Sequence, residues 1–497
     1  MRILTKKGFT HLSVLVCVLC LIGLVISELS VLTPKAQAIP AFARKYGVSC
    51  NVCHVPGFPK LNDFGNQFRD QGYQVGSDMD LPTYESITMG YFPVSFRTTV
   101  GYQIASVKSD GKGTTTGGFG FTGLDILSFG TLHRDLSLGV VFTPELGSAG
   151  FGTGASDGDL EAAFIRLNRL EKYLGIKEEQ GRYLMNLKVG KFEIDVPFSE
   201  KRSPTLNTPF VMYHYMPGTP YTGSISLAST STRTYSNPNT FALGDNSPGI
   251  ELAGITKTSF TDGFFRYSLA GLSTNTFSGP LSGCPSGPNS PPCGTGGRNI
   301  NFYGHMTQSF GGYGIVTGHR IGVFGLYGNA PTRVNAACPE CIAVGGTNEP
   351  FWRIGTDVSL TYDGQWNLFG AFMHGNDSRN LFASQPSITN PQSAAWNGAF
   401  VQLDWYPTQF PVLGIPGLLL SYRYDVIRNT KQGDPSVAKN YNDVDSHTGM
   451  LRYYIHQSTR TDLAFHLEYN YYRAQGVGTG GGAMNGQTTL VGLDFAY

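Results

Sequence analysis

Apolar and polar residues alternate along most of this chain, with the period of a β-strand that has one apolar and one polar face. In the stretch TDLAFHLEYNYY, one face carries the polar residues Asp462, His466, Glu468 and Asn470. The opposite face consists of Leu463, Phe465, Leu467, Tyr469 and Tyr471. FVQLDW and LLLSYRYDV alternate in the same way. This pattern predicts strands that separate an apolar surrounding from a polar one.

About sixteen such segments, each near the roughly 9 to 11 residues of a tilted membrane strand, follow one another after residue 88. The last one, TTLVGLDFAY, is amphipathic and ends in an aromatic residue, so it resembles the assembly signal of bacterial outer-membrane barrels. We therefore predict a mainly β fold, with an antiparallel outer-membrane β-barrel of about sixteen strands over residues 89–497. A soluble sandwich also alternates, but soluble sheets rarely reach about sixteen strands in one unit.

The connections between these segments differ in length. Short turns such as TYDGQ and HQSTRTD contrast with long Ser-, Pro- and Asn-rich stretches at 217–247, 278–299, 329–349 and 376–395. In outer-membrane barrels the short turns face the periplasm and the long loops face outward. An even number of strands then places both ends of the barrel on the periplasmic side.

Residues 1–38 have the pattern of an export signal. Lys6 and Lys7 precede an apolar core, and AQA at 36–38 is a small-residue cleavage site, so we expect cleavage after Ala38. The alternative is an uncleaved membrane anchor, because the apolar run is long for a signal. Either alternative places the protein outside the cytoplasm.

The overall charge argues against a polyanionic partner. Only 14% of the residues are charged and the net charge is +1, so no strong electrostatic field favours nucleic acid. We therefore expect outer-membrane lipid around the barrel and no nucleic-acid partner.

Six cysteines remain after the signal, in three close pairs. These pairs are Cys50 with Cys53, Cys284 with Cys293 and Cys338 with Cys341. In an exported protein the last two pairs are interpreted as disulfides that staple loops. A zinc or iron site formed by these four cysteines is the alternative, and it fits an oxidising compartment less well.

Residues 50–54 read CNVCH, the attachment motif for covalent haem c. Two thiols spaced in this way can bond the two vinyl groups of one haem, and the adjacent histidine can ligate its iron. Cys50, Cys53 and His54 are therefore the predicted cofactor-binding residues, with His54 as the metal ligand. The alternative is a disulfide or redox CxxC pair that happens to precede a histidine.

Residues 39–88 predict a small helical domain around this motif. IPAFARKYG and PKLNDFGNQFRDQGY read as two short helices, and Leu61, Phe64 and Phe68 form a stripe that can cover a haem face or pack on itself. A domain of about fifty residues needs a staple to fold, which covalent haem supplies. Met79 and Met89 are candidates for the sixth iron ligand, alongside a histidine of the barrel lumen or an open site.

The run AIPAFARKYGVSCNVCHVPGFPKLNDFGNQFRDQGY, followed by a barrel that contains VGKFEIDVPFSEKRSPTL at 189–206, resembles the fused outer-membrane monohaem cytochrome–porin family. The resemblance implies a role in the oxidation of extracellular Fe(II), with one haem c held at Cys50, Cys53 and His54. It also implies a haem domain in or under the barrel and periplasmic c-type cytochromes as partners. An activity as an iron:cytochrome c oxidoreductase is left open by the sequence.

Three functions are compatible with the sequence. The first is an electron conduit from an extracellular donor, Fe(II) by resemblance, through the haem to periplasmic carriers. The second uses the same haem to export electrons to an external acceptor. The third is a diffusion porin in which the haem segment is only a plug, and polar residues such as Arg166, Asn168, Asp404, Arg423 and Asp425 merely hydrate the lumen.

Overall fold

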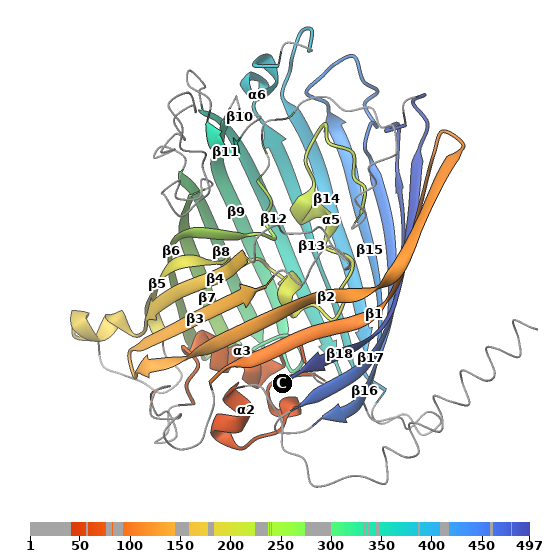
Figure 1. Ribbon diagram of the computed structural model, residues 1–497. Coiled ribbons are helices and arrows are strands. Elements are labelled where there is room, and N and C mark those ends of the chain that lie inside the picture. Colours follow the sequence, from red (N-terminus) through yellow and green to blue (C-terminus); the bar gives the residue numbers. More distant parts are fainter. Residues whose placement is uncertain are drawn as a thin grey trace, which may run out of the picture.

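Sixteen antiparallel strands close into one barrel, which confirms the predicted fold class (Figure 1). The computed structural model describes residues 41–55, 58–75, 82, 93–144, 159–176, 183–223, 237, 239, 241–273, 300–331, 334–335, 338–342, 348–385, 388–407, 417–457, 461–478 and 480–497. Strands β1 and β18 close the barrel, with Arg97 opposite Ala496 and Ser109 opposite Met484. The sheet therefore has no open edge.

The first eight barrel strands are β1 (Ser95–Ser109), β2 (Lys112–His133), β3 (Leu136–Thr143), β4 (Asp159–Leu167), β5 (Tyr183–Glu193), β6 (Asn246–Thr258), β7 (Gly263–Ser273) and β8 (Ile300–Phe310). The second eight are β9 (His319–Pro331), β12 (Asn348–Tyr362), β13 (Trp366–Asp377), β14 (Ala394–Trp405), β15 (Leu418–Lys431), β16 (Val444–Gln457), β17 (Asp462–Ala474) and β18 (Met484–Ala496).

Short elements lie before the barrel and in its connections. The helices are α2 (Ala41–Tyr46), α3 (Asp63–Asp70), α5 (Val211–His214) and α6 (Arg379–Ala383), and the 3-10 turns are η1 (Cys50–Val52), η2 (Leu170–Leu174) and η3 (Glu200–Arg202). Strands β10 (Val334–Asn335) and β11 (Cys338–Ile342) pair with each other outside the barrel sheet. Helices α2 and α3 confirm the two short helices predicted around the CxxCH motif.

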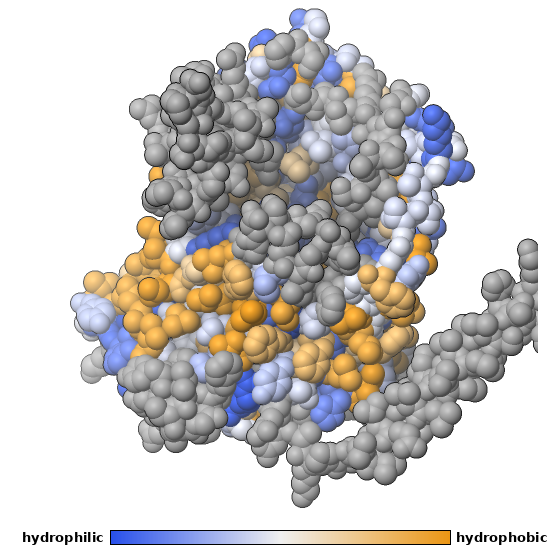
Figure 2. Space-filling model, in the orientation of Figure 1, coloured by the Kyte–Doolittle hydropathy of each residue, from blue (hydrophilic) through white to orange (hydrophobic). Residues whose placement is uncertain are grey.

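The two faces of the wall follow the alternation of the sequence. On β17, Leu467, Tyr469 and Tyr471 are exposed on the outer face, whereas His466 and Glu468 are buried in the lumen. Figure 2 shows apolar residues gathered in a band across the visible face of the barrel. The outer surface is therefore suited to lipid and the inner surface to polar partners.

The two ends of the barrel differ in their connections. At one end β12 and β13 are joined by the three residues 363–365, of which Asp363 and Gly364 have positive φ, as in a tight hairpin turn. The opposite end carries the 52-residue connection of residues 194–245, between β5 and β6. By the rule for outer-membrane barrels, the end with the β12–β13 turn is the periplasmic end.

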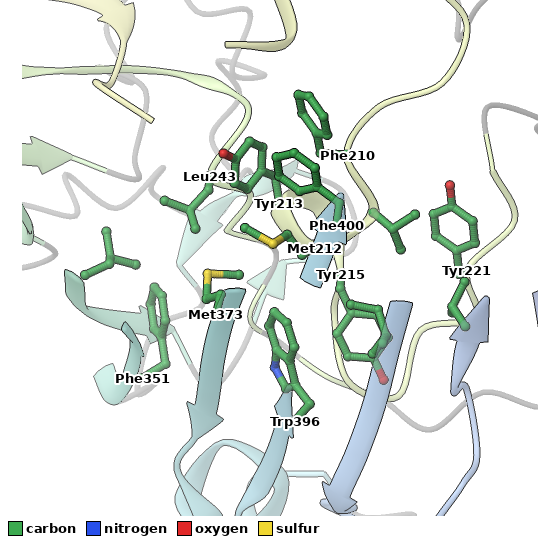
Figure 3. Close-up of a cluster of buried hydrophobic side chains, with 14 of the residues drawn as sticks. Phe210, Met212, Tyr213, Tyr215, Tyr221, Leu243, Phe351, Met373, Trp396 and Phe400 are labelled. Carbon is green, nitrogen blue, oxygen red and sulfur yellow. The ribbon is translucent and has the colours of Figure 1, made fainter. Parts of the chain in front are cut away.

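The described part of the connection 194–245, here called the inner loop, folds into the lumen and fills much of it. Its apolar residues include Phe210, Val211, Met212, Tyr213 and Leu243 (Figure 3). They pack against the wall residues Phe351, Met373, Trp396 and Phe400. The length and the Ser, Pro and Asn content of 217–247 predicted an outward loop, but Tyr221 is buried against the wall residue Tyr472. Apolar side chains draw this segment inward because they would otherwise face water.

Polar anchors hold the inner loop against the opposite wall. The Glu468 carboxylate accepts hydrogen bonds from the amides of Leu206, at 2.7 Å, and Asn207, at 3.2 Å, and from the Thr208 hydroxyl, at 2.6 Å. Asp425 accepts from the amide of Val211 at 3.2 Å. The lumen carboxylates predicted from the alternation are thus structural partners of the inner loop.

Residues 41–75, here called the N-terminal segment, close the periplasmic end of the barrel, near the C-terminus (Figure 1). The Ala41 amide donates to the Ser95 hydroxyl of β1 at 2.8 Å, and Gln74 donates to the carbonyl of Arg134 in the β2–β3 turn at 2.6 Å. Tyr454 of β16, three strands from β1 around the barrel, donates to the Phe58 carbonyl at 2.9 Å. The segment is therefore fastened to several strands of the barrel rim.

Several sequence predictions lie outside the described residues: the export signal 1–38, Met79, Met89, and the side chains of Cys284, Cys293, Cys338 and Cys341. None of the helices in the described part of the chain has the length and apolarity that crossing a bilayer requires.

Candidate functional site

The CxxCH motif forms one tight turn in front of the barrel lumen. The amides of Cys53 and His54 both donate to the carbonyl of Cys50, at 3.1 and 2.9 Å, and close the 3-10 turn η1. This turn brings the two cysteines and the histidine to the wall of one cavity. The structure thus places the three predicted residues together.

Asn62 fixes the turn to helix α3. Its side-chain carbonyl accepts from the Gly65 amide at 2.9 Å and caps the helix. Its side-chain amide donates to the carbonyls of Asn51 and Val52, at 3.1 and 2.9 Å. One side chain therefore caps α3 and satisfies two carbonyls of the motif turn.

Gly65 allows α3 to approach the motif closely. A methyl group at this position would lie 2.1 Å from the carbonyl oxygen of Cys53, well inside van der Waals contact. Only glycine fits here without displacing the motif backbone. The close packing of α3 against the motif thus explains the glycine in NDFGNQF.

His54 is held in one orientation by the backbone. Its Nδ1 lies 3.2 Å from the carbonyl of Lys60, and a carbonyl only accepts, so Nδ1 carries the proton. This tautomer leaves the lone pair on Nε2. Burial lowers the pKa of His54 to about 4, despite the opposing backbone hydrogen bond, so the imidazole is neutral at physiological pH.

The two cysteine thiols are reduced and face the cavity. Neither Cys50 nor Cys53 forms a disulfide with a described residue, and burial raises the pKa of Cys53 to about 11. Two thiols beside a neutral imidazole are a donor set suited to covalent attachment and axial ligation of a porphyrin.

The cavity in front of the motif has a volume of about 1230 Å³ and lies inside the barrel. A pocket for one small molecule typically measures about 300 to 1,000 Å³, so this cavity has room for a large planar cofactor and additional solvent. Near the motif its apolar lining consists of Phe42, Phe58, Leu61, Phe68, Phe129 and Phe164. Farther along, charged residues from β2 to β6 and from the inner loop line the wall, among them Asp125, Glu161, Lys188 and Glu200.

The predicted Leu61, Phe64 and Phe68 stripe is divided. Leu61 and Phe68 line the cavity, as the haem-covering interpretation requires. Phe64 is 42% exposed and stacks on Phe68, with ring centroids 6.4 Å apart. Two of the three residues therefore face the site, and the third covers them from outside.

Lys60 anchors the motif to the far wall. Its ammonium group lies 2.5 Å from the Asp404 carboxylate of β14 and donates to Asn367 of β13 at 2.8 Å, and all of this is buried. Because the Lys60 carbonyl also orients His54, this ion pair connects the histidine to the barrel wall.

Asp70 anchors the other end of α3. Its carboxylate lies 2.8 Å from the Arg266 guanidinium of β7 and accepts from the Tyr313 hydroxyl at 2.5 Å. Burial alone would raise the pKa of Asp70, but Arg266 and Arg69 hold it below its usual value. Asp70 is therefore a charged anchor.

Sequence reasoning missed these anchors. Arg166 and Asp404 were predicted as lumen residues, but not as partners of the N-terminal segment, where Arg166 donates to the Arg69 carbonyl at 2.9 Å. No local pattern in the sequence marked Lys60 or Asp70 as an anchor, because their partners lie in distant strands. Among the described residues, no group of three or more His, Cys, Asp or Glu side chains is arranged to hold a metal ion.

Comparisons with known proteins find structural similarity at low sequence identity. No protein-family model and no curated protein matches the sequence. Among solved structures, the anion-selective porin from Comamonas acidovorans is similar over 81% of this chain and 99% of its own, with 13% identity and a TM-score of 0.46. OprB from Pseudomonas putida covers 83% of this chain and 96% of its own, with 10% identity and a TM-score of 0.44. The outer-membrane channel DcaP of Acinetobacter baumannii covers 80% and 96%, with 10% identity and a TM-score of 0.40.

Proposed function

We propose that this protein is an outer-membrane electron conduit, in which one covalent haem c at the periplasmic end of the barrel connects an extracellular donor with periplasmic carriers. The observation that carries the proposal is the position of Cys50, Cys53 and His54, which open together onto a large cavity inside a closed barrel. Lipid blocks the movement of charge, and a barrel of this size provides an opening through it.

The residues of the site fit a covalent haem. Cys50 and Cys53 supply two reduced thiols, and His54 supplies a neutral imidazole with a lone pair on Nε2. The hydrogen bond from Nδ1 to the Lys60 carbonyl is the arrangement that orients metal-bound histidines in other proteins. Phe58, Leu61 and Phe68 provide an apolar wall beside these donors.

Each part of the chain has a defined role in this proposal. When bound, the haem iron supplies one-electron chemistry by changing between its ferric and ferrous states. Cys50 and Cys53 tether it, His54 ligates it, and Lys60 holds the histidine in place. The apolar outer wall keeps the barrel in the outer membrane, and the Asp404 and Arg266 anchors keep the segment in its opening.

The donor and the acceptor come from the resemblance stated above. Extracellular Fe(II) would give up one electron and become Fe(III), and a periplasmic c-type cytochrome would accept that electron. The reverse direction, electron export to an external acceptor, uses the same site. A measured midpoint potential separates the two directions, since a low value favours export.

The test is a visible absorption spectrum of the purified, haem-loaded protein before and after addition of Fe(II). The expected result is the conversion of the oxidised to the reduced haem spectrum, and a Cys50→Ala, Cys53→Ala double variant should give no haem signal. A haem-loaded wild-type protein that stays oxidised with Fe(II) would contradict the proposed donor.

A diffusion porin is the second candidate, because the cavity extends beside the inner loop from the motif to residues such as Glu161 and Asp245. Liposome swelling with small solutes tests it. Equal swelling with the wild type and with the double cysteine variant would favour a porin whose haem segment is only a plug.

A further inference from the structure

A half-buried arginine faces the CxxCH motif from the barrel wall. Arg97 lies on β1 between Ser95 and Thr99, which are both buried on the inner face, whereas Val100 of the same strand is exposed on the outer face. The Arg97 side chain points into the lumen, is only 18% exposed and lines the same cavity as Cys50, Cys53 and His54. A guanidinium is always charged, so it needs an anionic or carbonyl partner in such a place.

In the described part of the chain, the carboxylate that pairs with this arginine does not lie within hydrogen-bond distance of it. Among the described residues, the carboxylate that Arg97 approaches is that of Asp125, at 4.0 Å, which is beyond hydrogen-bond distance. Asp125 itself accepts from the Thr143 hydroxyl at 3.1 Å. The half-buried Arg97 guanidinium, which has five N–H donors, therefore has capacity for a further acceptor.

The other arginines around the cavity are engaged more closely. Arg202 lies 3.0 Å from the Glu193 carboxylate, and Arg266 lies 2.6 Å from that of Asp195. Arg166 donates to the Arg69 carbonyl at 2.9 Å. The contrast singles out Arg97 as the guanidinium of this cavity that has a place for a ligand.

Arg97 also lies close to the histidine of the motif. Its guanidinium stacks on the Phe58 ring, 5.3 Å from the centroid, and the other neighbour of this ring is His54, with centroids 5.3 Å apart. One aromatic ring thus separates the imidazole from the guanidinium. A haem carries its iron at the centre and two propionate carboxylates on its rim. A histidine that ligates the iron and a cation that pairs with a carboxylate therefore lie at separate points of one site.

We propose that Arg97 is a positioning residue that binds a propionate carboxylate of the haem. The assignment rests on the proposed function, because it requires the covalent haem. Guanidinium and carboxylate groups match in a charge-assisted, bidentate hydrogen bond, which a lysine cannot reproduce. A cation near the propionate also disfavours the ferric state, which carries one more positive charge than the ferrous state.

The experiment compares the haem-loaded wild type with Arg97→Gln, Arg97→Lys and Asp125→Asn variants. The readouts are the intact mass, the midpoint potential and the vibrational bands of the propionates in resonance Raman spectra. In Arg97→Gln we expect attached haem, a lower midpoint potential and shifted propionate bands. Arg97→Lys should shift the propionate bands but leave the midpoint potential close to that of the wild type. Lysine keeps the positive charge but lacks the bidentate geometry of the guanidinium. Asp125→Asn should not lower the potential.

Three outcomes would overturn the assignment. One is an unchanged potential and unchanged propionate bands in haem-loaded Arg97→Gln and Arg97→Lys. Another is a decrease in Asp125→Asn equal to that in Arg97→Gln, which would mean that Arg97 serves only to pair with Asp125. If the wild type carries no haem, the proposed function and this assignment fall together, whereas normal haem attachment with unchanged potentials removes the assignment alone.

Discussion

Replacing Asp404 by asparagine should release the N-terminal segment from the barrel wall. Asp404 is fully buried and lies 2.5 Å from the Lys60 ammonium group, and it also accepts hydrogen bonds from Gln402, at 2.8 Å, and from Ser421. Asparagine has nearly the same shape but leaves Lys60 charged and buried without a carboxylate. Removing one partner of a buried ion pair costs about 3 to 5 kcal/mol.

This loss of free energy should weaken the docking of the N-terminal segment rather than the stability of the barrel. The barrel wall is held by sixteen paired strands, whereas the segment depends on a few contacts that include this ion pair. A loss of about 4 kcal/mol corresponds to roughly a thousandfold increase in the undocked population. Limited proteolysis of the purified protein, followed by mass spectrometry, should therefore show cleavage within residues 41–75 while the barrel fragment survives.

The control is an exposed ion pair on the same barrel. Lys257 and Asp262 lie 3.8 Å apart with side chains that are 67% and 87% exposed, so Asp262→Asn should cost about 0 to 1 kcal/mol and leave the cleavage rate unchanged. A Lys60→Met, Asp404→Leu double variant should recover part of the lost docking, since no unpaired charge remains. Cleavage of Asp404→Asn at the wild-type rate would refute the anchoring role of this pair.

Three further predictions concern the outer wall, the motif and the inner loop. Ile354→Arg, in the middle of β12 where the side chain is 58% exposed, should destabilise the protein in lipid vesicles by about 2 to 4 kcal/mol, and an unchanged denaturation midpoint would argue against a lipid-facing wall. Gly65→Ala should lower the stability by about 1 to 3 kcal/mol and reduce haem attachment, because the added methyl group meets a backbone carbonyl. Intact masses measure the extent of attachment, and full attachment would contradict the close packing of α3. Burial opposes a charged His214, but the Glu200 carboxylate, 2.7 Å away, outweighs it and raises the pKa of His214 above 6.5. The stability from this pair is therefore complete below pH 6.5 and is lost as the pH rises through the raised pKa. Hydrogen-exchange protection of the inner loop should fall over that range in the wild type and not in His214→Gln, and equal profiles would contradict the role of the pair.

Local patterns were enough to predict the wall and the motif. Alternation fixes which side chains share a face, so Leu467 and Glu468 were assigned to opposite sides of β17 as the structure has them. The CxxCH spacing brings Cys50, Cys53 and His54 together in one turn because the five residues are contiguous. These predictions involve residues that are close together in the sequence, so the local backbone geometry determines their relative positions.

Contacts between distant parts of the chain were beyond this reasoning. Lys60 and Asp404 are 344 positions apart, and no local pattern indicates that they pair. Residues 217–247 were interpreted as an outward loop because this stretch is long and rich in Pro, Ser and Asn. The apolar run PFVMYHY at 209–215 was the signal for the inward packing of the inner loop, but its destination depends on Phe351, Trp396 and Phe400, which come from other strands.

The most direct test of the central claim is the intact mass of the processed protein from the outer-membrane fraction. The account predicts a chain that carries the added mass of one haem, and a Cys50→Ala, Cys53→Ala variant that reaches the same membrane without it. A wild-type chain at its bare polypeptide mass, in cells that attach haem to other c-type cytochromes, would contradict the account.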